Sequence, residues 1–220
     1  MMADWPGIFV TFEGPEGGGK STQAERLANR LESEGRTVVR TREPGGTPVG
    51  EAIRCLLQHD EVGHDLVPEA ELLLFEASRA QLVREIILPA LLRGDAVISD
   101  RFADSTTAYQ GYGRGEPIEP LLAINDYAIA TAVPNVTFLI DIDTDTGFRR
   151  LAERYSGGPA DHDRFERETR EFHEKVRQGY LALSKRWPNR FQIIDGAQDV
   201  DSVSDGIWNI FETLSAARSS

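Results

Sequence analysis

The sequence predicts an α/β fold in which helices cover both faces of a five-stranded parallel sheet. Five short runs rich in apolar and β-branched residues alternate along the 220 residues with segments of helical periodicity, and this alternation is typical of parallel sheets. The first run ends in a glycine-rich loop that opens the first helical segment. Neither an internal repeat nor a long linker divides the chain, so residues 1–220 are expected to form one domain.

The strands are predicted from apolar runs that end in polar or turn-forming residues. They cover residues 8–13 (IFVTFE), 37–41 (TVVRT), 95–100 (DAVISD), 136–143 (VTFLIDID) and 190–195 (RFQIID). Ligands of parallel sheets bind beyond the carboxyl ends of the strands. The polar residues that follow these runs are therefore the candidates for a binding site.

The segments between the strands carry apolar residues at helical spacing. Ala24, Leu27, Ala28 and Leu31 form one such stripe, and Gly35 is a stop signal. Helices are expected over residues 20–35, 50–58, 70–94 with a kink at Pro89, near 104–110, near 118–131, 145–155, 164–187 and 201–217. The flexible sequence SGGPADHD at 156–163 indicates a lid, about 150–166, inserted within the domain.

Charge and composition exclude several classes of protein. The formal net charge of −12 argues against a broad nucleic-acid surface, which needs a basic face, although a small site for a nucleotide can still be locally basic. No apolar run approaches the roughly 20 residues of a membrane span, and MMADWPGIF lacks the features of a secretory signal. We expect a cytoplasmic protein whose partners include neither a nucleic-acid polymer nor a membrane.

The loop after the first strand carries the most specific motif. GPEGGGKS at 14–21 fits GxxxxGK[ST] at every fixed position, follows a strand and opens a helix. In such loops the backbone N–H groups converge on phosphate oxygens, the lysine reaches the β- and γ-phosphates, and the hydroxyl ligates Mg²⁺. The motif predicts a nucleoside triphosphate site formed by Gly14, Pro15, Glu16, Gly17, Gly18, Gly19, Lys20, Ser21 and Thr22.

The third strand ends in a pair that suggests a second phosphate. Asp100 at this place can hold Mg²⁺ through water, and the adjacent Arg101 can hold another anion. The pair favours phosphoryl transfer between two bound phosphorylated molecules, with Lys20 and Arg101 as catalytic cations. A switch or ATP-binding protein without transfer chemistry stays open, although the NKxD motif with which GTPases read guanine is absent from the sequence.

Several further segments make the chain resemble the thymidylate kinase family along nearly its whole length. They are FEGPEGGGKST (12–22), TREPGGTPVGEAIR (41–54), FEASR (75–79), DRFADSTTAYQGYGRG (100–115), the DRFE at 163–166 and IIDGAQ (193–198). The resemblance implies a P-loop fold of the nucleoside monophosphate kinase type. It also implies phosphorylation of dTMP to dTDP with ATP and Mg²⁺, a place in dTTP synthesis, and a homodimer.

The resemblance implies which residues contact dTMP. They are Glu13, Glu43, Pro44, Arg54, Phe75, Arg79, Arg101, Ser105, Thr106, Tyr109 and Gln110. Arg54 and Arg101 would hold the phosphate, and two arginines suit a dianion better than one. Phe75 would stack on thymine while Arg79 and Gln110 bond its edge, a set that suits a flat, uncharged pyrimidine.

The resemblance also implies roles around the sugar and the adenine. Tyr109 would crowd the 2′ position and favour a deoxyribose, and Glu13 would lie near the sugar and the Mg²⁺ shell. Residues 43–45 would shape the wall between the two nucleotides. Gly196 and Ala197 would line the adenine site.

The remaining catalytic charge is expected in the lid. An acceptor phosphate is already ionised near neutral pH, with a second pKa of about 6, so no general base is required and catalysis becomes alignment and charge neutralisation. Some members of the resembled family carry an arginine in the phosphate loop, which this loop lacks. We expect Arg154 first and Arg164 second to act instead, with Arg150 on the same helix face as Arg154 at the ATP site. Glu16 is expected to pair with a lid arginine.

Another acceptor remains open from the residues alone. A kinase for a different nucleoside monophosphate, such as dUMP, or for a nucleoside would share the phosphate loop. Phe75, Arg79 and Gln110 favour thymine over these alternatives.

Overall fold

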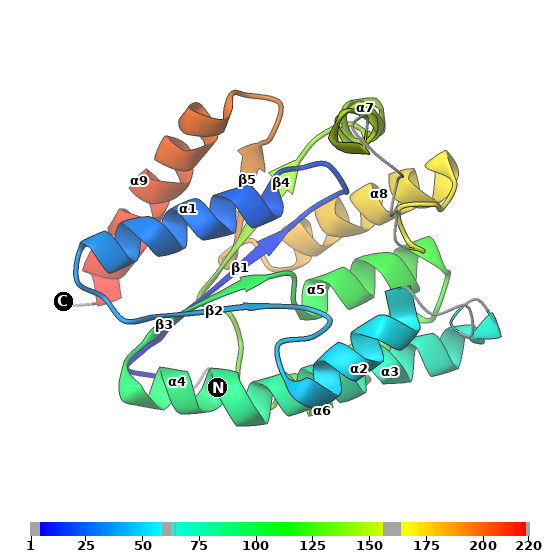
Figure 1. The fold of residues 1–220 in the computed structure, drawn as a ribbon, viewed down its shortest axis with the longest axis horizontal. Helices are drawn as coiled ribbons and strands as arrows, with labels where there is room; N and C mark the ends of the chain where they lie inside the picture. The colour runs from blue at the N-terminus through cyan, green and yellow to red at the C-terminus, as the bar shows by residue number, and fades with distance from the viewer. Residues whose placement is uncertain (1–4, 59–62, 64, 156–163, 219–220) are drawn as a thin grey trace.

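The computed structural model describes residues 5–58, 63, 65–155 and 164–218 of the chain. Its strands form one parallel five-stranded sheet in the order β2-β3-β1-β4-β5 (Figure 1). The strands are β1 Ile8–Glu13, β2 Val38–Arg42, β3 Ala96–Asp100, β4 Val136–Asp141 and β5 Phe191–Asp195. The predicted five-stranded parallel sheet is confirmed.

Helices connect the strands throughout. Their bounds are α1 Lys20–Ser33, α2 Pro48–Gln58, α3 Pro68–Leu82, α4 Leu88–Arg93, α5 Ala103–Thr106, α6 Ile118–Ile129, α7 Thr144–Tyr155, α8 Arg170–Arg186 and α9 Val200–Arg218. Two π-helical segments, η2 Val83–Ile87 and η3 Thr107–Gly113, continue α3 and α5. Among the residues that the structure describes, no helix is both long and apolar enough to cross a membrane.

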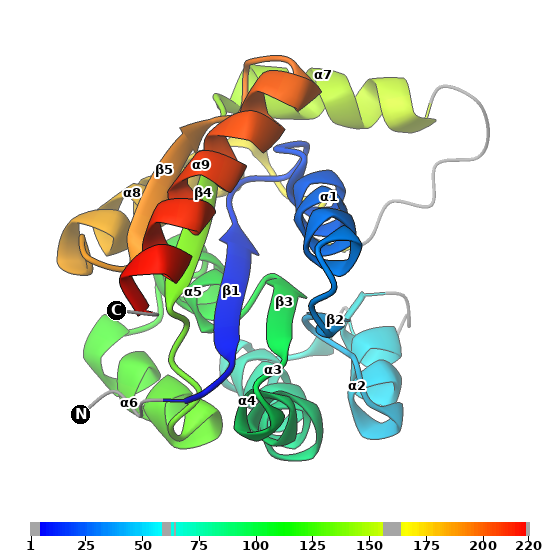
Figure 2. The same cartoon turned by 90° about the vertical axis from the view of Figure 1, so that its left-hand side faces the viewer.

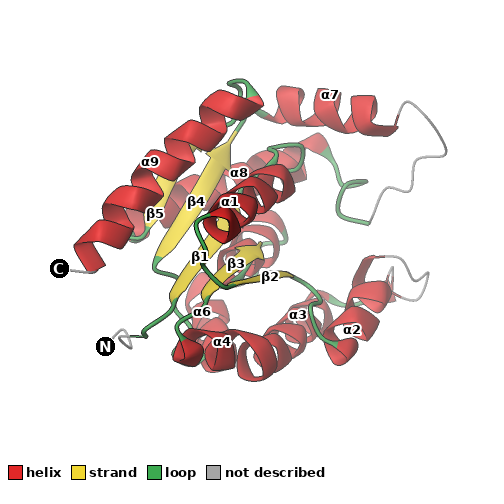
Figure 3. Cartoon of the chain, turned by 60° about the vertical axis from the view of Figure 1, so that its left-hand side comes forward, coloured by secondary structure: helices red, strands yellow, loops and turns green. Residues whose placement is uncertain are grey.

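The sheet separates two layers of helices, as Figures 2 and 3 show. Val10 and Phe12 of β1 pack in a buried cluster with α1 and α9. Phe9, which points to the opposite face, packs in a second cluster with Leu82 and Val83 at the α3–η2 junction and with α4. Successive strand residues face opposite sides of a sheet, so an almost continuous apolar run is what a strand buried on both faces requires.

The helix expected over residues 70–94 contains a π-helical segment. It runs as α3, η2 and α4, and η2 ends at Ile87, two residues before Pro89. Proline has no N–H for the helical ladder, so a local change in hydrogen-bond pattern beside it is expected. The short helix expected near 104–110 likewise continues as η3 to Gly113.

The helix expected over residues 164–187 begins only at Arg170, so that prediction was wrong at its start. Thr169 is the N-cap, and its hydroxyl accepts a hydrogen bond of 3.2 Å from the Phe172 amide. Residues 164–168 form turns, in which the Arg164 amide donates to the Gln58 carbonyl over 3.3 Å. A charged sequence fits either state, and here the cap and the long-range contacts decide it. The loop predicted at 156–163 lies outside the described residues.

Candidate active site

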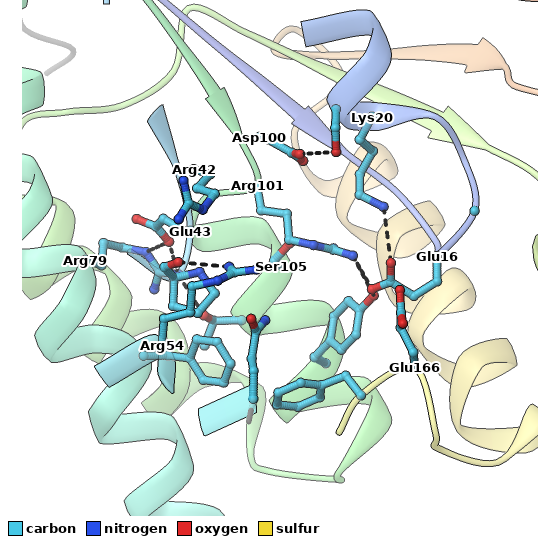
Figure 4. A pocket seen from close by; sticks show the side chains of 18 of the residues that line it. Glu16, Lys20, Arg42, Glu43, Arg54, Arg79, Asp100, Arg101, Ser105 and Glu166 are labelled. Carbon is cyan, nitrogen blue, oxygen red and sulfur yellow. Dashed lines mark hydrogen bonds and ion pairs between the residues drawn. The ribbon is translucent and has the colours of Figure 1, made fainter. Parts of the chain in front are cut away.

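A cavity of about 490 Å³ lies beyond the carboxyl ends of the strands, a volume typical of a small-ligand site. The phosphate loop, the ends of β2 and β3, α2, α3 and η3 form its walls (Figure 4). On the loop side it is lined by Glu16, Gly17, Gly19, Lys20, Ser21 and Thr22. Predicted acceptor residues at the opposite wall are Glu43, Pro44, Arg54, Phe75, Arg79 and Gln110. Between them lie Asp100, Arg101, Ser105, Thr106, Tyr109 and Arg154.

The phosphate loop depends on glycine for its shape and for its contact with α7. Gly17 has φ 74°, in the left-handed region that favours glycine. A Cβ on Gly17 would lie 2.6 Å from the Gly147 carbonyl oxygen, so the loop and α7 touch through backbone atoms. Because α7 carries Arg150 and Arg154, this close approach brings their helix to the loop.

The base of the loop is closed by two hydrogen bonds to one carbonyl oxygen. The Gly18 amide donates to the Pro15 carbonyl over 3.3 Å, and Lys20 Nζ donates to the same oxygen over 2.7 Å. Burial, helped by Arg101, lowers the pKa of Lys20 to about 8, although Glu16 opposes the shift. Lys20 therefore remains mostly charged near neutral pH.

Ser21 and Asp100 meet at the edge of the cavity, as the sequence predicted for a magnesium site. Ser21 Oγ donates to Asp100 Oδ2 over 2.5 Å, and both residues line the cavity. These are hard oxygen donors, and Mg²⁺ characteristically takes only one or two protein oxygens beside phosphates and water. The pair fits that ion, whereas no cluster of three or more His, Cys, Asp or Glu side chains suited to a metal occurs in the described ranges.

Arg101 is the centre of the polar network. Its backbone has φ 70°, a left-handed conformation that is uncommon for a residue with a side chain and concentrates at functional sites. Its amide donates to the Phe12 carbonyl over 2.9 Å. The guanidinium lies over the Tyr109 ring, 5.0 Å from the ring centroid, and donates to the Tyr109 hydroxyl over 3.0 Å.

Glu16 pairs with Arg101, not with the lid arginine that was expected. Its carboxylate accepts hydrogen bonds from Arg101 Nη2 and, over 2.7 Å, from the Tyr109 hydroxyl, and it lies 3.9 Å from Lys20 Nζ (Figure 4). Burial raises the pKa of Glu16, but Arg101 and Lys20 outweigh burial and bring it to about 2. The earlier expectation was wrong because the folded chain places a nearer arginine, at the end of β3, beside the loop.

Glu13 lies behind the cavity wall, although it was expected on the sugar and metal shell. It is fully buried, and it accepts hydrogen bonds from the Phe102 amide over 2.8 Å, Ser105 Oγ over 2.6 Å and the Tyr180 hydroxyl over 3.0 Å. Burial and then Asp104 raise the pKa of Glu13 from 4.5 to about 7, against Ser105, Arg101 and the Phe102 amide. In this arrangement Glu13 supports the residues around Arg101 rather than facing the cavity.

Three aromatic side chains pack together on the acceptor side of the cavity. Phe75 and Phe165 have ring centroids 5.7 Å apart, and Tyr109 lies 6.0 Å from Phe165. Gln110 lines the cavity beside them and donates to Glu71 Oε1 over 2.9 Å. Flat apolar faces with an amide at one edge suit a pyrimidine.

Arg79 has protein acceptors for all its N–H donors, which differs from the expected contact with a base. Nε and Nη2 donate to Glu43 Oε2 over 2.8 and 2.6 Å, Nη2 also donates to Thr106 Oγ1 over 2.8 Å, and Nη1 donates to Glu76 and, over 2.9 Å, to Asn125. Arg79 is 1% exposed. Burial raises the pKa of Glu43 to about 7, although Arg79 opposes the shift. A direct bond to a base would require one of these donors to be shared.

Arg54 lies at the cavity wall beside the loop that follows β2. Its Nη1 donates to the Pro44 carbonyl over 3.1 Å, which holds the guanidinium next to the residues expected between the two nucleotides. Arg42, to which the sequence gave no role, also lines the cavity and forms a two-oxygen contact with Glu51 at 3.0 and 2.9 Å.

The two lid candidates occupy different places. Arg154 lines the cavity and lies 3.5 Å from Glu166 Oε1, which also lines it. Arg164 instead binds Glu71 over 2.5 Å and the carbonyls of Leu57 and Gly63 over 3.1 and 2.9 Å. Arg154 therefore lies at the cavity, whereas Arg164 connects residues 164–168 with α2 and α3.

Arg150 connects the phosphate loop with the loop after β5. Its Nη1 donates to the Gly196 carbonyl over 2.9 Å and lies 3.4 Å from the Gly17 carbonyl. The Gly196 amide donates to the Asp141 carbonyl over 2.9 Å, and the Ala197 amide donates to Asp195 over 3.0 Å. The two residues expected at the adenine therefore lie next to the phosphate loop.

Comparisons with known proteins identify the family of the chain. The family model described as thymidylate kinase matches residues 12–207. The chain belongs to the thymidylate kinase family. It is 47% identical to the thymidylate kinase of Solidesulfovibrio magneticus, over 94% of this chain and 100% of the relative, and 46% identical to that of Syntrophotalea carbinolica, over 91% and 93%. The crystal structure of thymidylate kinase from Ehrlichia chaffeensis matches with a TM-score of 0.75 and 35% identity, covering 94% of this chain and 98% of that one. The predicted family and P-loop kinase fold are confirmed.

Some residues at this site were not found from the sequence. Gln58, Phe165 and Glu166 line the cavity, and Tyr180 and Glu71 support it. Phe165 and Glu166 belong to the DRFE segment that carried the resemblance, which was a usable signal. Glu71 and Tyr180 lie in helices where their partners are distant in sequence, so periodicity offered no sign of their contacts.

Proposed function

We propose that this chain transfers the γ-phosphoryl group of ATP to the phosphate of dTMP and produces dTDP. One observation carries the proposal beyond family membership. Lys20, expected at the donor phosphates, and Arg101, expected at the acceptor phosphate, both contact the carboxylate of Glu16 within one cavity. Two cationic groups this close suit two phosphates held side by side for direct transfer.

On the donor side the loop N–H groups and Lys20 would hold the β- and γ-phosphates of ATP. Arg150 would keep the loop next to Gly196 and Ala197, where the adenine would lie. Ser21 and Asp100 would hold Mg²⁺, in part through water. When bound there, Mg²⁺ would neutralise phosphate charge.

On the acceptor side Arg101 and Arg54 would hold the dTMP phosphate. The thymine would stack on Phe75, with Gln110 and Thr106 near its edge. Because its donors are engaged, Arg79 would act mainly by fixing the positions of its partners, Thr106 and Glu43. Tyr109 would lie against the deoxyribose.

No general base is needed for this transfer, because the attacking phosphate oxygen is ionised near neutral pH. Arg154 would supply the remaining positive charge at the γ-phosphate, since it lines the cavity on a helix that touches the phosphate loop. Arg164 would have no direct part in the chemistry, because its guanidinium is bound to Glu71 and two carbonyls away from the loop.

A coupled assay of ADP release over dTMP, dUMP, UMP, CMP, AMP and thymidine tests the proposal. We expect the highest kcat/KM with dTMP, and a requirement for Mg²⁺. If another monophosphate is preferred, the proposed acceptor is wrong but the proposed reaction, phosphorylation of a nucleoside monophosphate, stands. If thymidine is preferred, the protein is a nucleoside kinase. ADP release that is independent of any acceptor would contradict transfer and favour a switch or ATP-binding protein.

We also propose that the enzyme is a cytoplasmic homodimer in dTTP synthesis, as family membership suggests. Large apolar side chains are exposed on three helices: Val49 on α2 is 52% exposed, Leu73 on α3 is 56% exposed and Tyr127 on α6 is 83% exposed. Such side chains would belong to a dimer interface only as parts of one contiguous patch. Analytical ultracentrifugation should give twice the chain mass, and a monomer at micromolar concentration would contradict the proposal.

A further inference from the structure

The guanidinium of Arg101 is held on its inner side by two hydroxyl groups that share one carboxylate. Nη1 donates to Ser105 Oγ and to the Tyr180 hydroxyl, each over 3.1 Å. Both hydroxyls donate in turn to Glu13 Oε2, over 2.6 and 3.0 Å. Each hydroxyl thus accepts from the arginine and donates to the glutamate, so that Glu13 is linked to Arg101 through two hydroxyl groups without touching it.

Glu13 also holds the backbone next to Arg101. Its other oxygen, Oε1, accepts a hydrogen bond of 2.8 Å from the Phe102 amide. The left-handed backbone of Arg101 therefore lies between two fixed points, since its own amide is bound to the Phe12 carbonyl. One buried carboxylate orients both the backbone and the side chain of this arginine.

The Nη2 side of the Arg101 guanidinium is more accessible from the cavity than the Nη1 side. Nη2 donates to Glu16 and to the Tyr109 hydroxyl, and the Glu16 side chain is 17% exposed at the cavity. Glu13 and Tyr180 are fully buried. An anion that enters the cavity can therefore compete for Nη2, whereas Tyr180 and Glu13, on the Nη1 side, are closed to it.

We propose that Tyr180 and Glu13 are positioning residues that hold Arg101 as a preformed receptor for the acceptor phosphate. The inference rests on the proposed role of Arg101 in binding dTMP. Neither residue would touch the substrate. They would act by fixing the position of Nη1 of Arg101. Nη2 would then still point into the cavity when the phosphate replaces Glu16 as its acceptor. A receptor fixed in advance loses little conformational freedom on binding.

In this proposal Tyr180 and Glu13 affect the binding of the dTMP phosphate but not of the nucleoside, so a comparison of dTMP with thymidine tests it. Tyr180→Phe removes one hydroxyl and keeps the ring that packs edge-on against Tyr109. We expect the dTMP dissociation constant to rise about tenfold, the effect of losing one hydrogen bond to a charged group. The dissociation constant of thymidine, which lacks the phosphate, should stay within twofold. Both constants are measured by isothermal titration calorimetry.

Tyr112→Phe is the matched control. Tyr112 lies on η3, and its ring is the nearest group to a Cβ built on Gly179 of α8, so it belongs to the same helix interface. It should bind dTMP as the wild type does. A double-mutant cycle with Arg101→Ala completes the test, because an effect that acts through Arg101 must disappear when Arg101 is absent.

The outcomes are distinct. A loss confined to dTMP that vanishes in the Arg101→Ala background supports the positioning role. An equal loss for thymidine, an equal loss in the Arg101→Ala background, or an unchanged dTMP constant overturns it. If Tyr180→Phe has no effect while Arg101→Ala weakens dTMP binding, the positioning role fails and the proposed role of Arg101 stands. If Arg101→Ala itself leaves dTMP binding unchanged, the proposed phosphate site fails as well.

Discussion

Replacing Arg154 with alanine should separate catalysis from binding and from stability. Arg154 lies near the end of α7, lines the cavity, and forms a 3.5 Å contact with Glu166. Its side chain is 56% exposed. The substitution removes one positive charge near the phosphate loop while it leaves the buried Arg101 network in place.

The expected magnitudes differ strongly between rate and stability. An ion pair with one partner this exposed is screened by solvent and contributes about 0–1 kcal/mol to folding. A cation that neutralises the transferring phosphoryl group is worth about 10³-fold or more in rate, equivalent to about 4 kcal/mol. The dTMP KM should change less than about threefold, because Arg101 and Arg54 hold the acceptor phosphate in our proposal.

Steady-state ADP release with dTMP and ATP varied separately measures the effect, and urea denaturation measures stability. Arg149→Ala is the control, because Arg149 lies on the same helix but is exposed and contacts the Thr146 hydroxyl over 3.3 Å. Turnover of the Arg154 variant close to that of the wild type would refute the reasoning. So would a comparable loss in the Arg149 variant, or a large rise in dTMP KM at unchanged kcat.

Three further predictions concern the supporting residues. Arg164→Ala should lower the free energy of unfolding by about 1–3 kcal/mol, because the bond to buried Glu71 is lost. Its kcat should stay within a few-fold of the wild-type value. A 10³-fold fall in kcat would instead support a catalytic role for Arg164. Arg79→Ala should lower the free energy of unfolding by about 3–5 kcal/mol, because the buried carboxylates of Glu43 and Glu76 lose their counter-ion. A loss under 1 kcal/mol in urea denaturation would contradict this prediction. The pKa of Glu13 is raised from 4.5 to about 7, so between these pH values the folded protein keeps a proton on Glu13 that the unfolded chain loses. The contribution of Glu13 to the free energy of unfolding should therefore fall as the pH rises from about 4.5 to about 7. Denaturation at pH 5 to 8 should show this fall in the wild type relative to Glu13→Gln; parallel curves would argue against it.

The sequence was most informative where the structure is local. The phosphate loop could be predicted with its strand and helix because 14–21 is one continuous segment whose motif contains its own geometric requirements. Ser21 and Asp100 were predicted to share a magnesium site because both lie at the carboxyl ends of predicted strands, and they meet because β1 and β3 are neighbours, with Phe12 paired to Asp100. These inferences needed only the elements and the rule that sites lie beyond the carboxyl ends of strands.

The sequence was least informative about which charged groups pair. Glu16 and Arg101 are 85 residues apart, and a sequence with many arginines leaves several partners possible for each carboxylate. The assignment of Glu16 to the lid failed because Arg101 reaches the loop from the neighbouring strand. Arg164, the second candidate for the catalytic arginine, is bound by Glu71 of α3.

By itself, the sequence determined the order of strands and helices, the phosphate loop and the family, because these depend on contiguous motifs and on apolar periodicity. Only the tertiary structure decided that Glu13 is buried under Arg101 while Glu16 faces the cavity, although the two residues are three positions apart in the sequence. The physical reason is that burial and hydrogen-bond partners are properties of the packed chain. Three donors, from Phe102, Ser105 and Tyr180, converge on Glu13 only when α8 lies against η3 and the end of β3.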